Sequence, residues 1–187
     1  ARGAKVLGLC LGAFVVAETL KELSKRNLKV AVYGVGTVQE ELGLRGVTPS
    51  TFAVDPQVGF AIDVGFATDL PDIPKKLLGE IKLGGGPELN RSCDNNVVLG
   101  RMVRKIAAKH KIAYQETAAH RASGGTDAAQ MQMTRAGVAT ALVSIPNRYM
   151  HSPVEMCDLR DVEGAVKLLT ESIAALKGVE SFIPGID

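Results

Sequence analysis

The chain has 187 residues, of which 46% are hydrophobic but only 4% are aromatic, so its core must be built from aliphatic side chains. Its formal net charge of +2 provides no strong attraction to nucleic acid or to an acidic membrane surface, and we expect neither as a partner. Its three cysteines, Cys10, Cys93 and Cys157, are far apart and form neither a metal motif nor a disulfide framework, which indicates a reducing compartment.

Helical and strand patterns alternate along the chain. The apolar run at 6–17 is too short to cross a bilayer, and apolar positions at helical spacing predict an amphipathic helix from about residue 13 to about residue 27. The later patterns predict strands at 28–35, 58–64, 112–116 and 138–145, and helices at 48–53, 99–106, 127–135 and 158–176. This alternation implies an α/β fold: a mostly parallel sheet flanked by helices on both faces, in one domain, 1–187.

Two adjacent carboxylates, Glu40 and Glu41, follow the first predicted strand. Adjacent carboxylates resist joint burial unless a cation or hydrogen bonds compensate them. The carboxyl end of a strand in an open α/β sheet is where ligands bind. One glutamate could therefore bind a metal while the other acts as a general base, or the pair could form a solvated acidic turn.

Two further candidates lie at or beyond the ends of predicted strands. Asp63 interrupts an apolar strand, so it is either a metal ligand or a hydrogen-bonded structural residue. His151 lies in the loop after the last strand and is either a ligand or ordinary surface. His120 is expected at the surface, with a substrate contact as the alternative. Two carboxylates and an imidazole suit Zn, Mn or Co.

Several motifs, taken together and in order, resemble the M42 family of metallo-aminopeptidases. That family includes glutamyl aminopeptidases, the tetrahedral large peptidases and proteins labelled endoglucanase M. The stretch 37–46 reads Thr-Val-Gln-Glu-Glu-Leu-Gly-Leu-Arg-Gly, and the other matching stretches are 61–64, 69–71, 84–87, 125–128 and 148–155. They cover nearly the whole chain.

The resemblance implies roles by position. Glu40 is expected to be the general base, Glu41 and His151 ligands of one metal ion, and Asp63 a ligand of the other. The residues expected in the substrate-facing wall are Gly86, Pro87, Thr126 and Asp127. The implied reaction removes the N-terminal residue from a short peptide, with Zn or Co as the cofactor, in the cytoplasm.

The sequence departs from the family pattern at the metals. The best alignment places Gly8 where the family has a bridging Asp, and the stretch 5–12 contains no carboxylate. The family's upstream His-x-Asp segment and its inserted dimerisation domain would precede residue 1. We therefore expect an impaired site that holds one ion or none.

Three functions are compatible with these residues. The first is a metal-dependent aminopeptidase, and the second is a catalytically inactive, engineered or trimmed structural scaffold derived from that fold. The third is a sugar hydrolase that pairs Glu40 with Asp63, but it leaves His151 without a role and ranks last. A homo-oligomer remains open, because exposed apolar surface would favour self-association.

Overall fold

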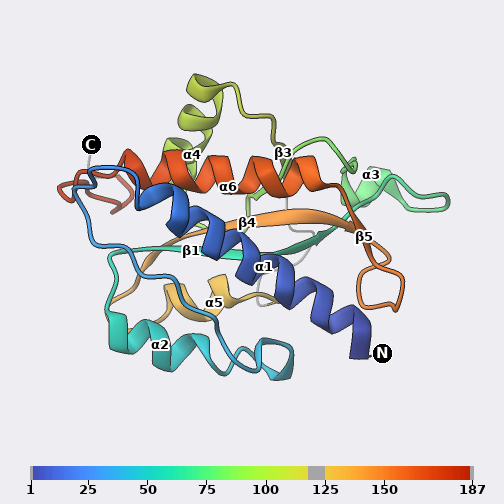
Figure 1. Cartoon of the computed structure of the whole chain (residues 1–187), viewed down its shortest axis with the longest axis horizontal. Helices are drawn as coiled ribbons and strands as arrows, with labels where there is room; N and C mark the ends of the chain where they lie inside the picture. The colour runs from blue at the N-terminus through green and yellow to red at the C-terminus, as the bar shows by residue number, and fades with distance from the viewer. Residues whose placement is uncertain (1, 118–124, 186–187) are drawn as a thin grey trace.

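The computed structural model of the chain describes residues 2–117 and 125–185, with side chains from residue 11 onward except at 77. The helices are α1 (Arg2–Leu23), α2 (Val47–Val54), α3 (Lys75–Leu78), α4 (Val97–His110), α5 (Asp127–Gln132) and α6 (Leu159–Ala174), with a short 3-10 turn, η1 (Glu40–Leu42). The strands are β1 (Val58–Phe66), β2 (Glu88–Asn90), β3 (Gln115–Thr117), β4 (Ala139–Arg148) and β5 (Met156–Cys157). In Figure 1, α4 and α6 lie above the sheet, α1 crosses in front of it toward the lower right, and α2 and α5 lie below it.

The strands form one mixed sheet in the order β1-β4-β2-β3, with β5 beside β4. β1 and β4 are parallel along the whole of β1, from the Val58–Ala139 pair to the Phe66–Asn147 pair. β2 is parallel to β3 and antiparallel to β4. The predicted α/β fold with helices on both faces of a sheet is therefore confirmed. β1 and β4 both run toward the right-hand end of Figure 1, so polar residues at their carboxyl ends are brought to one edge.

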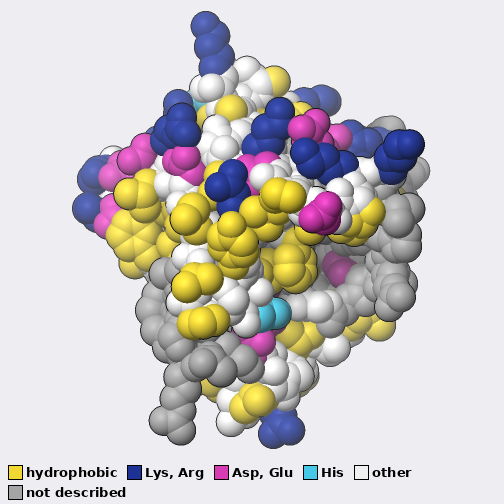
Figure 2. Space-filling view, turned by 90° about the vertical axis from the view of Figure 1, so that its right-hand side faces the viewer, with side chains coloured by type: hydrophobic (Ala, Val, Ile, Leu, Met, Phe, Trp, Pro, Cys, Tyr) yellow, Lys and Arg dark blue, Asp and Glu magenta, His cyan; other side chains and the backbone are white. Residues whose placement is uncertain are grey.

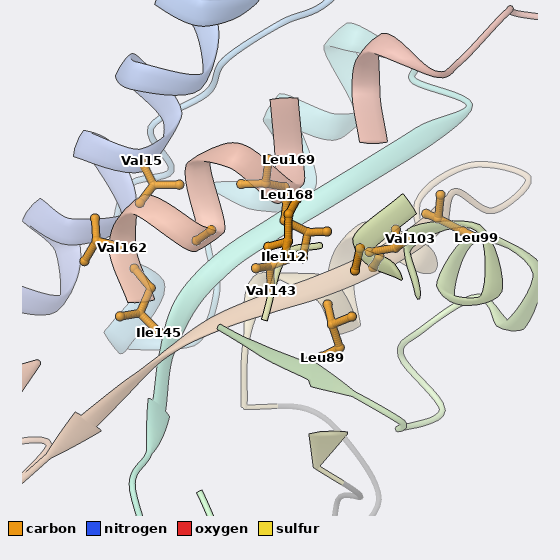
Figure 3. Packing of buried hydrophobic residues seen from close by; sticks show 13 residues of the cluster. Val15, Leu89, Leu99, Val103, Ile112, Val143, Ile145, Val162, Leu168 and Leu169 are labelled. Atoms are coloured by element: carbon orange, nitrogen blue, oxygen red, sulfur yellow. The ribbon is translucent and has the colours of Figure 1, made fainter. Parts of the chain in front are cut away.

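The main core fills the space between the sheet and the layer of α1, α4 and α6. Val143 and Ile145 of β4 point into it, because alternate residues of a strand face the same side. Val15 of α1 and Leu168 of α6 meet them from the helix layer, and all four side chains are fully buried (Figure 3). This packing fixes the position of β4, and through it the position of its neighbour β1.

The opposite face of the sheet carries a much smaller apolar cluster. Ala61 of β1, Leu142 of β4 and Ala128 of α5 form it, with Met131 packed against them. Three of these four side chains are buried, but they fill only part of the face. The rest of this face is lined by polar residues, which form the candidate site described below.

The run 28–35 was predicted to be a buried strand, and this prediction is wrong. Within the described chain it pairs with no strand, and its residues Tyr33 and Val35 are 69% and 41% exposed. A strand needs a backbone partner as well as apolar side chains, and the described sheet ends at β1 on this side. The segment instead packs on α1, where a side chain at Gly34 would overlap Leu20.

The first helix is longer than the pattern predicted. It begins at Arg2 rather than near residue 13, so the stretch 5–12 is helical and the backbone of Gly8 lies inside α1. The third predicted strand is displaced from 112–116 to β3, and neither β2 nor α3 was predicted, because three or four residues carry too little periodicity. Within the described residues, no helix is both long and apolar enough to cross a membrane.

Candidate functional site

Four carboxylates and a histidine that the sequence singled out line one cleft of about 1500 Å³, whose lining also includes residues of α1 and α6. Glu40 and Glu41 lie in η1, Asp63 near the carboxyl end of β1, Asp127 at the first turn of α5, and His151 in the loop after β4. Figure 2 looks at the end of the molecule toward which β1 and β4 run, and it shows a hollow with acidic side chains and a histidine near it. Segments far apart in sequence are thus brought together, and the parallel pairing of β1 with β4 explains this for Asp63 and the loop of His151.

A tight turn holds the two adjacent glutamates at the cleft. Gln39 and Gly43 adopt left-handed backbone conformations, with φ values of 58° and 100°, on either side of η1. The N–H groups of Gly43 and Leu44 both donate to the carbonyl of Glu40, at 3.1 and 2.8 Å. These bonds use backbone groups only, so the turn does not depend on the carboxylates of Glu40 and Glu41.

Burial and, after it, neighbouring negative charges raise the pKa of Glu40 and of Asp63. Burial, followed by the negative charges of Asp63, Asp127 and Glu41, raises the pKa of Glu40 to about 7. Burial also raises the pKa of Asp63 to about 6, although the Val64 N–H, at 2.8 Å from Oδ1, acts in the opposite direction. Glu40 is therefore partly protonated at neutral pH, which is the property of a side chain that exchanges protons with a substrate.

Asp127 lies at the start of α5, where a threonine from the irregular segment reaches it. The Thr37 hydroxyl donates to Asp127 Oδ2 at 2.6 Å, and burial is the largest factor that raises the pKa of Asp127. Its other oxygen, Oδ1, is buried and accepts no hydrogen bond from the described residues. Thr126 occupies the N-cap position of α5 and lines the cleft, and its side chain makes no capping bond within the described chain.

Glu41 and His151 lie close to each other at the mouth of the cleft. His151 Nε2 is 3.4 Å from Glu41 Oε1. The loop that carries the imidazole is held by Glu155, whose Oε1 accepts the backbone N–H of His151 at 2.7 Å and whose Oε2 accepts from the Asn147 amide at 3.3 Å. The histidine itself has a left-handed backbone, with φ of 63°.

The donor atoms suit a divalent metal ion in type but not in arrangement. Glu41, Asp63 and His151 offer carboxylate oxygens and an imidazole nitrogen, the donors that Zn and Co accept. Among the described side chains, however, no group of three or more His, Cys, Asp or Glu residues converges as metal ligands do. The described residues do not by themselves complete a metal site.

The other predicted substrate residues lie elsewhere. Gly86 and Pro87 are buried and are not among the residues that line the cleft. The Gly86 N–H donates to Asp161 at 2.7 Å, and a side chain at this position would overlap the backbone of Ala113. The structure therefore shows a packing role for Gly86. His120, the remaining candidate, lies outside the described residues.

Among the acidic residues in the cleft that sequence reasoning missed is Glu88, at the start of β2. It is only 4% exposed, and burial together with the charge of Asp161 raises its pKa to about 8. The only signal in the sequence was an acidic residue directly after Gly-Pro and before a leucine, which is too common a pattern to single out.

Comparisons with known proteins show what the chain is similar to. A family model described as M42 glutamyl aminopeptidase matches residues 5–168. The lysyl aminopeptidase of Pyrococcus furiosus is 41% identical over 92% of this chain and 47% of its own length. The glutamyl aminopeptidase of Lactococcus lactis is 29% identical over 88% of this chain and 45% of its own. The chain thus spans about half the length of the curated relatives it matches.

The solved structures that resemble this chain include aminopeptidases as well. A TET aminopeptidase from a marine sediment archaeon of the Thaumarchaeota superposes with a TM-score of 0.84 and 35% identity, over 91% of this chain and 48% of the other. The structure titled PhTET1-12s, a dodecamer, superposes with a TM-score of 0.74 and 33% identity, over 91% of this chain and 50% of the other.

Proposed function

The chain belongs to the M42 glutamyl aminopeptidase family, and on that premise we propose that it carries part of the active site of an aminopeptidase that removes N-terminal residues from short peptides. The observation that carries this proposal is the half-buried Glu40, whose pKa is about 7, beside Asp63 in a cleft open to solvent. An acid or base with a pKa near the working pH transfers protons most effectively.

Glu40 is suited to both proton transfers of peptide hydrolysis. As a carboxylate it takes a proton from the water that attacks the peptide carbonyl. As a carboxylic acid it returns that proton to the amine that leaves when the C–N bond breaks. The charges of Asp63 and Asp127 help to keep its pKa near neutrality, so both forms are populated.

Glu41, Asp63 and His151 are the residues that we propose for a divalent ion, Zn or Co, which would supply Lewis-acid chemistry when bound. Because they do not complete a site in the described chain, we propose an occupancy of one ion or none. Assembly into a homo-oligomer is part of the proposal, since a similar solved structure is titled a dodecamer.

A second candidate is a catalytically inactive scaffold with the same fold. Two observations favour it: the described residues hold no cluster of three metal ligands, and the stretch 5–12 lies inside α1.

Metal content and hydrolysis decide between the two candidates. The protein is incubated with Zn or Co and desalted, and its metal content is compared with that of a Glu41→Ala/His151→Ala variant; hydrolysis of aminoacyl p-nitroanilides is then measured for wild type and Glu40→Gln. The aminopeptidase proposal expects one bound ion that the double variant loses, and hydrolysis that Glu40→Gln abolishes without loss of metal. Metal content no higher than that of the variant, together with no hydrolysis, refutes the enzyme and supports the scaffold.

A further inference from the structure

Asp69, in the chain that follows β1, binds two segments that are distant in sequence. Its two carboxylate oxygens accept hydrogen bonds from Nε and Nη2 of Arg148, the last residue of β4, at 2.8 and 2.7 Å. Oδ2 also accepts the backbone N–H of Leu83 at 3.1 Å. The Asp69 side chain is only 16% exposed, and the hydrogen bond from Arg148 is the largest factor that lowers its pKa. The carboxylate is therefore charged at neutral pH, and the ion pair is bidentate.

The backbone on either side of β1's last turn fixes Asp69 independently of Arg148. The Ala67 N–H donates to the carbonyl of Asn147 at 3.0 Å. The Thr68 N–H donates to the carbonyl of Ile81 at 2.8 Å, and the Thr68 hydroxyl accepts the Ile81 N–H at 2.8 Å. Thr68 and Asn147 are both buried. Because Asp69 follows directly, its carboxylate has a defined position, and an arginine that binds it with two N–H groups is held in one orientation.

Arg148 is also the first residue of the loop that carries His151. Tyr149 and His151 have left-handed backbones, with φ values of 59° and 63°, so the chain turns tightly after the strand. The carboxylate of Glu155 accepts the His151 N–H at 2.7 Å and holds the far side of the turn. With both sides held, the imidazole has a narrow range of positions, and its Nε2 lies 3.4 Å from Oε1 of Glu41.

The ion pair lies behind the cleft, whereas the residues that it positions face the cleft. His151 and Glu41 line it, but neither Asp69 nor Arg148 is among the described residues that do. Any effect of the pair on a reaction in the cleft therefore passes through the loop of His151. A displacement of about 1 Å at a reacting centre costs about a hundredfold in rate, so a residue that never meets the substrate can still control turnover.

We propose that Asp69 is a positioning residue of the active site: its bidentate ion pair with Arg148 holds the loop that places His151 beside Glu41. This inference rests on the aminopeptidase function proposed above. It separates two roles for acidic residues near the cleft, because Glu40 exchanges protons with the substrate while Asp69 sets the geometry of a neighbouring loop.

The test compares two bidentate ion pairs of similar burial. Asp69→Asn keeps the shape of the side chain and removes its charge, and the matched control is Glu171→Gln. Glu171 is 15% exposed and binds Arg26 with two hydrogen bonds, of 2.6 and 3.1 Å, and neither residue is among those that line the cleft. With aminoacyl p-nitroanilides, Asp69→Asn should lower kcat at least about tenfold with KM within about twofold, whereas the control should change neither. Arg148→Lys, which keeps the charge but loses the bidentate geometry, should also lower kcat.

Nuclear magnetic resonance supplies a readout that needs no turnover. A nuclear Overhauser contact between the imidazole of His151 and the side chain of Glu41 should be present in wild type and in Glu171→Gln, and lost in Asp69→Asn and Arg148→Lys. Circular dichroism at the assay temperature shows that each variant is folded. A pair that served stability alone would leave this contact unchanged in the folded protein.

The inference is overturned if the contact is missing in wild type, if Asp69→Asn retains it, or if Asp69→Asn keeps the kcat of an active wild type. A loss of kcat that Glu171→Gln shares also overturns it. If Asp69→Asn does not fold, Arg148→Lys decides by the same criteria. The failure of the proposed function looks different: no protein, wild type included, hydrolyses any aminoacyl p-nitroanilide, and a contact that Asp69→Asn loses then still supports the positioning role.

Discussion

Replacing Glu88 by Gln should change how the stability of the protein depends on pH. Below its ordinary pKa of 4.5, Glu88 is protonated in both the folded and the unfolded chain, so it adds no pH dependence. Between pH 4.5 and about 8 the unfolded chain ionises while the folded chain keeps the proton, so the free energy of unfolding falls as the pH rises. Above pH 8 both states are ionised and the loss is complete.

The structure gives the size of this effect. A pKa of about 8 in the fold, against 4.5 in the unfolded chain, corresponds to about 4 to 5 kcal/mol at 1.36 kcal/mol per pKa unit. The side chain is 4% exposed, so solvent screens little of this penalty. Gln has the shape of the protonated side chain and cannot ionise, which makes Glu88→Gln progressively more stable than wild type from pH 5 to pH 9.

Urea unfolding at pH 5, 7 and 9 measures the difference. The raised pKa values of Glu40 and Asp63 act equally in both proteins and cancel. Glu116→Gln is the control: Arg91 holds the pKa of Glu116 below its usual range, so Glu116 is ionised in both states above pH 6 and the difference from wild type stays constant. A difference between Glu88→Gln and wild type that does not grow with pH would show that Glu88 is ionised in the fold, and would refute the reasoning.

Three further substitutions test the framework of the site. Gly86→Ala should lower the free energy of unfolding by about 2 to 4 kcal/mol, because the position has a φ of 97° and no room for a Cβ. Gly125→Ala, where a Cβ would meet no atom of the described residues within 4 Å, should change it by less than about 0.5 kcal/mol in the same urea experiment. Asp161→Ala leaves the backbone N–H groups of Gly84 and Gly86 without their acceptor. It should lower the free energy of unfolding by about 2 to 3 kcal/mol, as measured by thermal unfolding. Thr37→Val removes the hydroxyl donor of Asp127, so the pKa of that carboxyl should rise further in a ¹³C NMR titration; an unchanged pKa would contradict the 2.6 Å hydrogen bond.

Much of the fold could be predicted from the sequence, because long helices and strands show a clear periodicity of apolar residues. The parallel pairing of β1 with β4 follows from two apolar runs separated by helices, and it brings Asp63 toward the loop of His151. The same rule placed Glu40 and Glu41 at this edge, although the run before them is not a strand. The turn at Gln39 and Gly43 positions them instead, and it depends on local backbone geometry.

The position of Glu88 could not be read from the sequence for a different reason. It depends on a strand of three residues, too short to show a period, that lies antiparallel to β4 where the alternation predicted parallel neighbours. It also depends on Gly65 of β1, because the absence of a side chain there leaves the space that the Glu88 carboxylate occupies. Contacts of this kind join residues through space, and no local pattern encodes them.

The parallel pairing of β1 with β4 also has a consequence for how the chain folds. Each residue of β1 meets its partner only after a loop of roughly 80 residues has closed, and that loop contains α3, α4, α5 and two other strands. Such long-range pairings lose chain entropy before any hydrogen bond of the ladder forms, which slows folding relative to helical proteins of the same size. Until that ladder forms, Asp63 and the loop of His151 have no fixed relation to each other, so the cleft cannot form before β1 and β4 pair.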